Sequence, residues 1–447
     1  MRTALVSGAE ARRLFVLAWP LVVAQLGWIT LGLVDSLMLG RVSTQVLAAG
    51  VLGHTWSFSL LVFGRGTVFG LDPLVTQAHG AEDRHAFDRA LAHGAVLAAL
   101  LAMPITALHL VAAPVLTWLG QPEALVPFAS EYAAVVGLSV LPTLLELVLR
   151  QGLQARERMM PSMWVALVGN VLNVPLNLVL IWGAGSWDGL GAIGAAWATT
   201  AVRIAMFLAI LVFAHQDARA LLRGLVQVRW ARLRAVAALS TPIGLQQALE
   251  VGGFSLATII VGWQGEDAVA AHTVALNLSA TAFMVPLGIS GAAATRVGNL
   301  IGAGQPWTTA AGTALLVGAG VMLGSATVFL TVPELLAGFW LGEAPEVLAL
   351  AGRLLSVAAA FSVFDGCQVV GFGVLRGAGD TLLPTLANLV AFYALGLPLG
   401  AVLAGPLGWG AVGVWLGLTV GLATVAVLLV LRIRVVAGRG GLRRHVG

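Results

Sequence analysis

The sequence predicts an all-α polytopic membrane protein, and three observations predict it. Of the 447 residues, 59% are hydrophobic and only 10% are charged, whereas a soluble domain carries about 25% charged residues. The apolar residues gather in long runs and not in the short alternating segments of a membrane β-barrel. The order of these runs and of the polar residues within them repeats once along the chain.

Twelve runs are long enough to cross a membrane, because about 20 helical residues span the hydrocarbon. We expect transmembrane helices at 14–39, 46–71, 90–119, 128–149, 161–183, 189–214, 235–263, 268–298, 309–332, 347–375, 382–404 and 408–431. The first run is too long for the core of a signal peptide and no small-residue cleavage site follows it, so we expect it to stay as a span.

The arginines predict the orientation of the chain. All 24 basic residues are arginine. Between the runs, 19 of them fall on one side, Arg41 falls on the other, and four lie in or at the ends of spans. The positive-inside rule therefore places both termini in the cytoplasm.

Two halves follow from the repeat. Pro20 recurs as Pro242, and GLGAIG at 189–194 recurs as GWGAVG at 408–413. Six spans in each half start both halves on the same face, so they are parallel repeats of a kind found in secondary transporters. Both glycine motifs open a membrane helix, so we interpret them as close helix contacts and not as dinucleotide sites. We expect an N-terminal lobe, a basic cytoplasmic linker and a C-terminal lobe at 1–215, 216–234 and 235–447.

The composition excludes several kinds of chemistry. A P-loop and a Schiff-base site both need lysine, which the sequence lacks, and we therefore expect no ATP site. Cys367 is the only cysteine, so disulfides within the chain and CxxC metal sites are impossible. The arginines are spaced between apolar runs, which does not indicate a nucleic-acid binder. Without HExxH, a nucleophile–base pair or a metal cluster, an enzyme is not expected.

Function is expected at the carboxylates within the apolar runs, which are Asp35, Glu250 and Asp365. An Asp at the centre of the bilayer costs about 2.5–3.5 kcal/mol on insertion scales. Such residues mark ion pathways unless they only pair with arginines in the spans, here Arg65, Arg203 or Arg353.

Helical spacing predicts the neighbours of these acids. Gln246, Gln247 and Phe254 share a face with Glu250, and Phe361 and Gln368 line up with Asp365. Three amides form one stripe in the fifth run, to which Thr199 can add a hydroxyl; they are Asn170, Asn173 and Asn177. Trp28 lies deep enough for a cavity wall, and Phe254 and Phe361 are expected in that wall too. Glu146, by contrast, is expected to pair locally with Arg150.

At these residues the sequence resembles the multidrug and toxic compound extrusion (MATE) family, in its NorM-type branch. The matching stretches run the whole length of the chain and keep their order. They are VDSLMLG ending the first run, PLVTQAHGA at 73–81, NVLNVPLN at 170–177, TPIGLQQALE at 241–250, AAHTVALN at 270–277 and FDGCQVVGFGVLRGAGDT at 364–381.

The resemblance implies two six-helix lobes around a central cleft. It also implies export of amphipathic, mostly cationic compounds against an inward flow of Na⁺ or H⁺ by a protein of the prokaryotic inner membrane. Glu250 and Asp365 match the cation-site carboxylates of the second lobe, with Na⁺ possible there. Asp35, Asn173 and Asn177, with Thr199, match the polar cluster of the first lobe.

The sequence departs from the family pattern at two positions. Phe361 stands where relatives can carry a tyrosine, and Asn177 stands where some carry a carboxylate. Na⁺ needs several oxygen ligands, which Glu250, Asp365, Gln246 or Gln247, Gln368 and a carbonyl can supply, whereas H⁺ needs one basic group. Both ions stay open. No cofactor is implied, a monomer in contact with membrane lipid is expected, and a flippase for a lipid-linked precursor is the alternative function.

Overall fold

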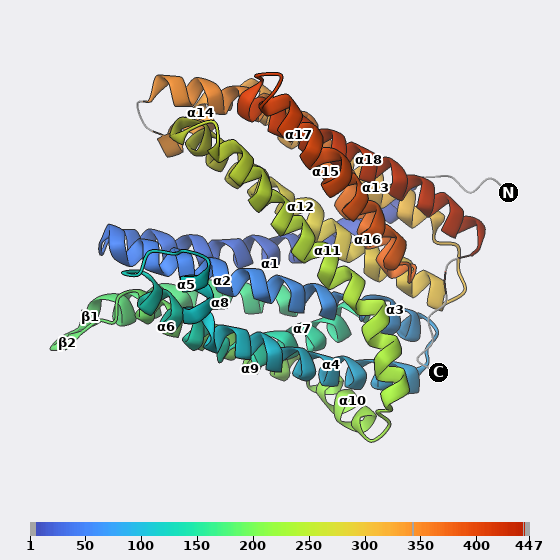
Figure 1. The fold of residues 1–447 in the computed structure, drawn as a ribbon. Coiled ribbons are helices and arrows are strands. Elements are labelled where there is room, and N and C mark those ends of the chain that lie inside the picture. Colours follow the sequence, from blue (N-terminus) through green and yellow to red (C-terminus); the bar gives the residue numbers. More distant parts are fainter. Residues whose placement is uncertain (1–5, 342–343, 441, 443–447) are drawn as a thin grey trace. The chain divides into compact units, whose positions relative to one another are not determined.

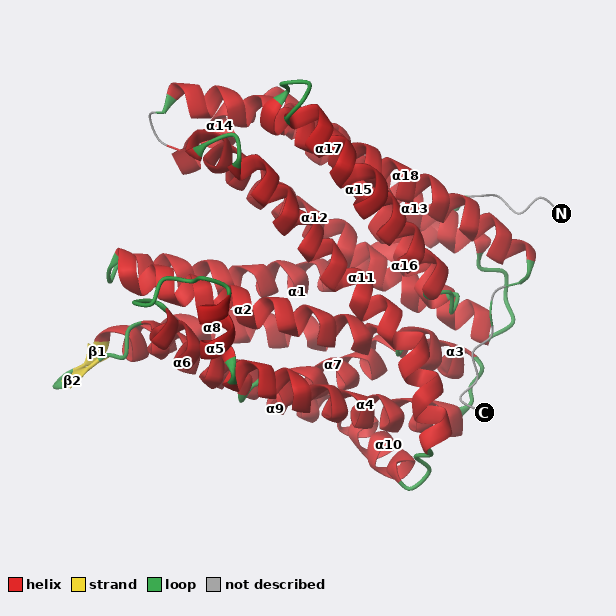
Figure 2. Cartoon of the chain, in the orientation of Figure 1, coloured by secondary structure: helices red, strands yellow, loops and turns green. Residues whose placement is uncertain are grey.

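The structure is a computed structural model that describes residues 6–341, 344–440 and 442, so Arg2, Arg443 and Arg444 of the orientation argument lie outside it. The described chain folds into eighteen α-helices, one π-helical segment and one short β-hairpin. Figure 1 labels helices and strands along the chain, and Figure 2 colours them by type. The elements of the first half are α1 (Gly8–Gly40), α2 (Thr44–Phe69), α3 (Asp72–Gly80), α4 (Arg84–Leu110), α5 (Ala112–Trp118), α6 (Val126–Gly137), α7 (Val140–Ala155), α8 (Met160–Trp182), β1 (Gly183–Ala184), β2 (Trp187–Asp188), α9 (Ala192–Phe213) and α10 (His215–Leu225). Those of the second half are α11 (Trp230–Gly262), α12 (Glu266–Gly302), α13 (Thr308–Thr331), α14 (Pro333–Leu341), α15 (Pro345–Gly377), α16 (Leu382–Leu389), the π-helical η1 (Val390–Gly396), α17 (Leu397–Ala404) and α18 (Gly410–Gly438).

The described helices confirm the fold class expected from the apolar runs. Eleven helical segments in the described residues are long and apolar enough to cross a membrane, and α2 and α3 together form one of them. A twelfth results if α6 and α7, which bend by 42° at a short break, form one span. The third run is shorter than expected: α4 ends at Leu110, and most of the rest forms the separate helix α5.

Local sequence fixes where several helices begin. Ser43 and Asp83 precede α2 and α4, and their side chains accept hydrogen bonds from the backbone N–H groups of Val46 and Ala86 at 3.1 and 2.9 Å. Such caps satisfy N–H groups that have no partner within the helix. A proline in the first turn starts α6, α8 and α15, where the missing N–H costs nothing.

The chain divides into two compact units, and two of the passages between them lie inside long helices. One unit contains the chain up to Val22, the turn Gly80–Glu82 and the chain from Leu245 onward. The other contains Val23–His79 and Asp83–Gly244. The passages near Val22 and Gly244 lie within α1 and α11. The expected division into two repeat halves, joined by a linker at 216–234, stays a prediction.

In the unit that contains most of the second half, α15 packs against α12, α13 and α18 (Figure 1). Its core includes the fully buried Trp415, together with Leu354, Phe392 and Leu422. In the other unit, α4 packs on α7 and α10, and α8 packs on α9. Each unit therefore has an apolar core of its own.

The repeated glycine motifs lie at close helix contacts, as the sequence predicts. A Cβ added to Gly194 in α9 would lie 2.1 Å from the carbonyl oxygen of Leu180 in α8. A Cβ added to Gly413 in α18 would lie 2.7 Å from the backbone of Leu403 in α17. Real Cβ atoms do not approach so closely, so only glycine permits these backbones to touch.

The basic linker contains the helix α10, which packs on the first half of the chain. Arg223 donates to Asp88 at 2.9 Å, and Arg156 donates to Asp217 at 2.8 Å. These ion pairs tie the linker to α4 and to the end of α7.

The span from α16 to α17 contains the π-helical segment η1. A π-turn takes one more residue than an α-turn. Two consecutive residues of this segment reach α11. The Tyr393 hydroxyl donates to the Leu249 carbonyl at 2.7 Å, and the Phe392 ring lies 5.6 Å from that of Phe254.

Candidate functional site

The first candidate site surrounds Asp35 in α1, which is only 3% exposed. Asn177 of α8 donates to one carboxylate oxygen at 2.6 Å, and Thr199 of α9 donates to the other at 2.6 Å. The Asn177 amide also donates to the oxygen of Asn173 at 3.0 Å. Both oxygens of the Asp35 carboxylate therefore have a hydrogen-bond donor within the protein.

Five residues are expected in this cluster, and the structure brings four of them together: Asp35, Asn173, Asn177 and Thr199. The fifth, Asn170, is directed elsewhere: its amide donates to the carbonyl oxygens of Gly27 and Ala166, each at 2.9 Å. Pairing between Asn173 and Asn177 follows from their four-residue spacing. Two buried atoms here, Asn173 Nδ2 and Asn177 Oδ1, have no hydrogen-bond partner in the described residues.

The second candidate site contains Glu250 of α11 and Asp365 of α15. The two carboxylates interact electrostatically with each other. Asp365 is 4% exposed and Gln368, one turn further on, is 1% exposed. Asp365 Oδ1 and Gln368 Oε1 are buried without a hydrogen-bond partner among the described residues. Carboxylate and amide oxygens without donors form an environment that attracts a proton or a cation.

Gln246 and Gln247 lie one turn before Glu250 on α11, with Gln246 buried and Gln247 half-buried. No hydrogen bond joins either of them to Glu250 or Asp365 in the described residues. Their place on the helix follows the sequence prediction, and their role as ion ligands stays a prediction.

Aromatic rings line the neighbourhood of the second site. The rings of Phe254 and Phe361, both expected as cavity wall, lie edge to face with centroids 6.1 Å apart. The rings of Phe361 and Trp415 also lie edge to face, with centroids 5.4 Å apart. This wall is apolar, and it adds no oxygen at position 361.

A chain of hydrogen bonds that the sequence analysis missed runs from Trp415 to α11. The Trp415 indole N–H donates to His272 Nδ1 at 3.0 Å, and His272 Nε2 lies 3.0 Å from the Thr258 hydroxyl. Because an indole nitrogen only donates, His272 Nδ1 accepts and the proton of the neutral ring lies on Nε2. The Thr258 hydroxyl in turn donates to the Phe254 carbonyl at 3.0 Å. Helical periodicity gives no signal for these hydrogen bonds, because the residues that form them lie on three different helices.

None of the three carboxylates in the spans is paired with an arginine in the described part of the chain. The alternative interpretation, in which Arg65, Arg203 or Arg353 neutralises them, is therefore not what the structure shows. Glu146 does form the expected local pair with Arg150, at 3.9 Å. Among the described residues, no group of three or more His, Cys, Asp or Glu side chains is placed to hold a metal ion.

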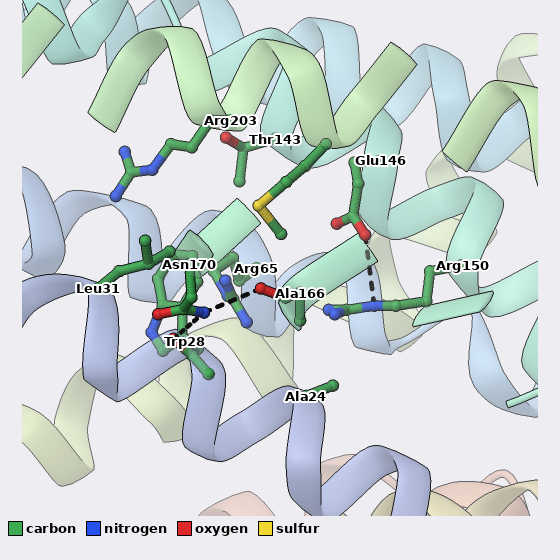
Figure 3. A pocket seen from close by; sticks show the side chains of 12 residues that line it. Ala24, Trp28, Leu31, Arg65, Thr143, Glu146, Arg150, Ala166, Asn170 and Arg203 are labelled. Atoms are coloured by element: carbon green, nitrogen blue, oxygen red, sulfur yellow. Dashed lines mark hydrogen bonds and ion pairs between the residues drawn. The ribbon is translucent and has the colours of Figure 1, made fainter. Parts of the chain in front are cut away.

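Trp28, expected as cavity wall, lines a pocket among α1, α2, α7, α8 and α9 (Figure 3). The Arg65 guanidinium carbon lies 3.6 Å from the centroid of the Trp28 ring, and that of Arg203 lies 5.4 Å from it. The Glu146–Arg150 pair lies at the other end of the pocket. From the sequence, these arginines are expected only as possible partners for the acids. Their presence within apolar runs marks each as unusual, but it does not show that both lie beside Trp28.

Comparison with known proteins agrees with this architecture. The profile of the MatE family matches residues 20–179 and 242–402, which fall in the two repeat halves. The chain is 36% identical over 436 residues to the probable multidrug resistance protein NorM of Bradyrhizobium diazoefficiens, with 95% of this chain and 93% of that protein covered. It is 35% identical over 426 residues to the multidrug resistance protein NorM of Burkholderia vietnamiensis, with coverage of 93% and 92%.

Solved structures share the fold. The eukaryotic MATE transporter AtDTX14 matches with a TM-score of 0.85 at 21% identity, covering 98% of this chain and 99% of that one. An outward-facing multidrug resistance MATE family transporter matches with a TM-score of 0.87 at 19% identity, covering 98% of each chain. The extent of the profile match and the identity to the NorM proteins show that this chain belongs to the MATE family, in its NorM-type branch.

Proposed function

We propose that this protein is a secondary active multidrug efflux antiporter. It exports amphipathic, mostly cationic compounds in exchange for Na⁺ or H⁺ that flows inward. The names of the NorM relatives, which are multidrug resistance proteins, support export of drugs. One observation carries the exchange mechanism: Glu250 and Asp365 lie in spanning helices with no ion pair in the described residues.

Coupling follows from competition for these carboxylates. A buried charge without a partner is unfavourable, so the pair favours binding one neutralising cation at a time. A proton or Na⁺ and a cationic substrate then exclude one another, and this negative coupling is reciprocal. Alternation of the two lobes between the membrane faces turns the exclusion into exchange.

In this proposal Glu250 and Asp365 bind the coupling ion. Gln246, Gln247 and Gln368 supply amide oxygens if the ion is Na⁺, which takes several hard oxygen ligands. H⁺ needs only one carboxylate. Asp35, with Asn173, Asn177 and Thr199, acts as a second switch nearer the substrate, while Trp28, Phe254 and Phe361 line its path.

The protein is proposed to act as a monomer in a prokaryotic inner membrane, with both termini in the cytoplasm. The arginines support this orientation, because they concentrate on one side of the spans. The transported compound and the ion are the partners in this proposal, and no cofactor, ATP or nucleic acid takes part.

The test is efflux of a cationic dye from proteoliposomes under an imposed Na⁺ gradient and, separately, under a pH gradient. Glu250→Gln and Asp365→Asn are each expected to abolish the gradient-driven component, because neither amide can take up the ion's charge. Asp217→Asn, which removes another buried carboxylate outside the spans, is the matched control and should keep the gradient response. Retention of the gradient response in both Glu250→Gln and Asp365→Asn would overturn the proposal.

One observation favours a second candidate, a flippase for a lipid-linked precursor. Such a protein needs basic groups facing a cavity to hold a diphosphate, and Arg65, Arg150 and Arg203 all line one pocket. Binding of a polyprenyl diphosphate to the purified protein, without binding of cationic dyes, would favour the flippase.

A further inference from the structure

His272 in α12 is a buried polar side chain that the proposed mechanism leaves unused. His272 and Trp415 of α18 are each 0% exposed. Both nitrogens of the His272 ring have a partner, because Nδ1 accepts from the Trp415 indole and Nε2 lies 3.0 Å from the Thr258 hydroxyl. An apolar ring could fill the same space, but only the imidazole can hold both partners in a fixed orientation.

Trp415 connects these hydrogen bonds to the aromatic wall of the second site. The Trp415 ring lies edge to face with the ring of His272, with centroids 5.9 Å apart, and with that of Phe361 at 5.4 Å. The Phe361 ring in turn lies 6.1 Å from that of Phe254. The four rings therefore form a continuous row that begins on α12 and passes through α18 and α15 to α11.

The two phenylalanines of this row lie next to the two acids of the second site. Phe254 follows Glu250 by one turn of α11, and Phe361 precedes Asp365 by one turn of α15. Residues four apart share a face of a helix, so each ring lies on the same face as the neighbouring carboxylate. All of these residues belong to one compact unit, the one that contains most of the second half of the chain.

The direction of the hydrogen bonds is fixed at both ends. The Thr258 hydroxyl donates to the Phe254 carbonyl at 3.0 Å, so its oxygen is left to accept from Nε2 of His272. The Trp415 indole can only donate, so Nδ1 accepts and the imidazole is neutral. His272 therefore acts by holding its neighbours in place and not by exchanging a proton.

An apolar wall beside two carboxylates affects how tightly they bind a cation. Opposite charges attract more strongly where water is excluded, because the effective dielectric constant is lower there. A ring that leaves its place admits water, which solvates both the carboxylates and the cation and weakens their attraction. Edge-to-face contacts between rings are individually weak, so the hydrogen bond that fixes Trp415 adds order to the whole wall.

We propose that His272 is a positioning residue for ion coupling. By fixing Trp415 against Phe361, it keeps water away from the neighbouring carboxylates and so raises their affinity for the coupling ion. The inference rests on the proposed function, because it assigns His272 to the site where the coupling ion is proposed to bind.

The first test separates ion affinity from transport rate. Efflux of a cationic dye from proteoliposomes is measured over a range of concentrations of the driving ion, Na⁺ or H⁺. His272→Phe is expected to raise the ion concentration for half-maximal efflux about fivefold, the effect of losing one buried hydrogen bond. The maximal rate should change much less, because Glu250 and Asp365 are both still present.

Two further variants distinguish positioning from a general loss of structure. His272→Asn places an amide oxygen near the position of Nδ1, so it can accept from Trp415 and should restore most of the ion affinity. Trp415→Phe removes the donor and should reproduce the shift of His272→Phe, with little further shift when the two changes are combined.

His93→Phe is the matched control. His93 of α4 is also buried and engaged at both ring nitrogens, with Nδ1 2.7 Å from the Arg89 carbonyl and Nε2 accepting from the Arg229 backbone N–H at 3.3 Å. It belongs to the other compact unit. His93→Phe should therefore leave the half-maximal ion concentration unchanged, even where it lowers the unfolding temperature.

The second test needs no transport. An ion that binds the folded protein raises its unfolding temperature, so the purified full-length protein in detergent is titrated with Na⁺ and, separately, with acid. Glu250→Gln identifies the part of the rise that is due to the second site. His272→Phe should move that part to a higher ion concentration, by the same factor as in the efflux measurement.

An unchanged ion concentration in His272→Phe, or an equal shift in His93→Phe, would overturn the inference. So would a His272→Asn protein that behaves like His272→Phe. If the ion titration shifts as expected but the unaltered protein shows no gradient-driven efflux, the proposed antiport alone is contradicted. If Glu250→Gln removes no part of the rise in unfolding temperature, both proposals fail.

Discussion

Both candidate sites contain carboxylates in spanning helices, but the hydrogen bonds to these carboxylates differ. Asp35 accepts hydrogen bonds at both carboxylate oxygens, from Asn177 and Thr199. Asp365 is equally buried, but its Oδ1 has no donor in the described residues, and its charged neighbour is another acid, Glu250. The first carboxylate accepts hydrogen bonds from the protein itself, whereas in the proposed mechanism the second pair takes its counter-charge from the coupling ion.

This difference suggests a division of work between the two halves of the chain. A site whose donors are built in already satisfies both carboxylate oxygens with hydrogen bonds from the protein. A site with unpaired oxygens responds strongly to one proton or one Na⁺. The predictions below test this contrast, beginning with the largest expected effect.

Removing the charge should have opposite effects on stability at the two sites. Asp35→Asn takes the charged acceptor from two donors, at about 1.5–3 kcal/mol for each bond, and should clearly lower the thermal unfolding temperature. Asp365→Asn removes an unpaired buried acid, so the temperature should stay the same or rise. Intrinsic fluorescence of the purified proteins on heating measures both, and equal losses at the two positions would remove the contrast.

The two halves should also differ at their repeated glycines. Gly194→Ala places a methyl group 2.1 Å from a carbonyl oxygen, a closer approach than the 2.7 Å at Gly413. We expect each change to cost about 1–3 kcal/mol, with the larger loss at Gly194. Gly320→Ala in α13 is the control, because nothing lies within 4 Å of its added Cβ, and it should raise stability by about 0.5–1 kcal/mol. A larger loss at Gly413 than at Gly194 would contradict the comparison.

The aromatic wall of the second site should depend on the Trp415–His272 hydrogen bond. Trp415→Phe leaves His272 Nδ1 without its buried donor, which costs about 1–2 kcal/mol. In a His272→Phe background the same change should cost less, because the acceptor is gone. A double-mutant cycle on thermal unfolding measures this coupling, and strictly additive losses would show that the hydrogen bond contributes nothing.

The smallest effect on stability is expected at Asp217, a buried carboxylate of α10 that forms an ion pair with Arg156. Burial raises the pKa of Asp217, and the Arg156 guanidinium partly offsets this. A raised pKa in the folded protein means that protonation favours the fold. Stability from this group is therefore present at low pH and is lost as the pH rises through the folded pKa.

At pH 7 Asp217→Asn should therefore change the free energy of unfolding by less than about 1 kcal/mol, and it should not lower it. Thermal unfolding between pH 5 and pH 7 provides the measurement. A marked loss in the variant at pH 7 would mean that the ion pair outweighs the cost of burial.

Much of this fold could be predicted from the sequence, because membrane spans are defined by length and hydropathy. The breaks do not follow from apolar composition, which does not record where a helix stops. Their local signals are Gly137 and Pro142 beside the bend between α6 and α7, and Pro114 just after the end of α4.

At the sites, spacing along one helix placed Asn173 and Asn177 together correctly. The same reasoning grouped Asn170 with them, although its amide has two carbonyl acceptors elsewhere. The basic pocket could not be anticipated, because Arg65 and Arg203 lie 138 residues apart and only tertiary packing brings both to Trp28.

The π-helical segment η1 has a consequence for how this span tolerates insertion and deletion. A π-turn accommodates a surplus residue within a helix. Deleting one residue between Val390 and Gly396 can therefore convert the turn to an α-turn while α17 keeps its facing toward α18. The same deletion in the unbroken α18 would rotate every following side chain by about 100°. Within this span, η1 is therefore a position where a change in chain length can be absorbed without turning the helix that follows.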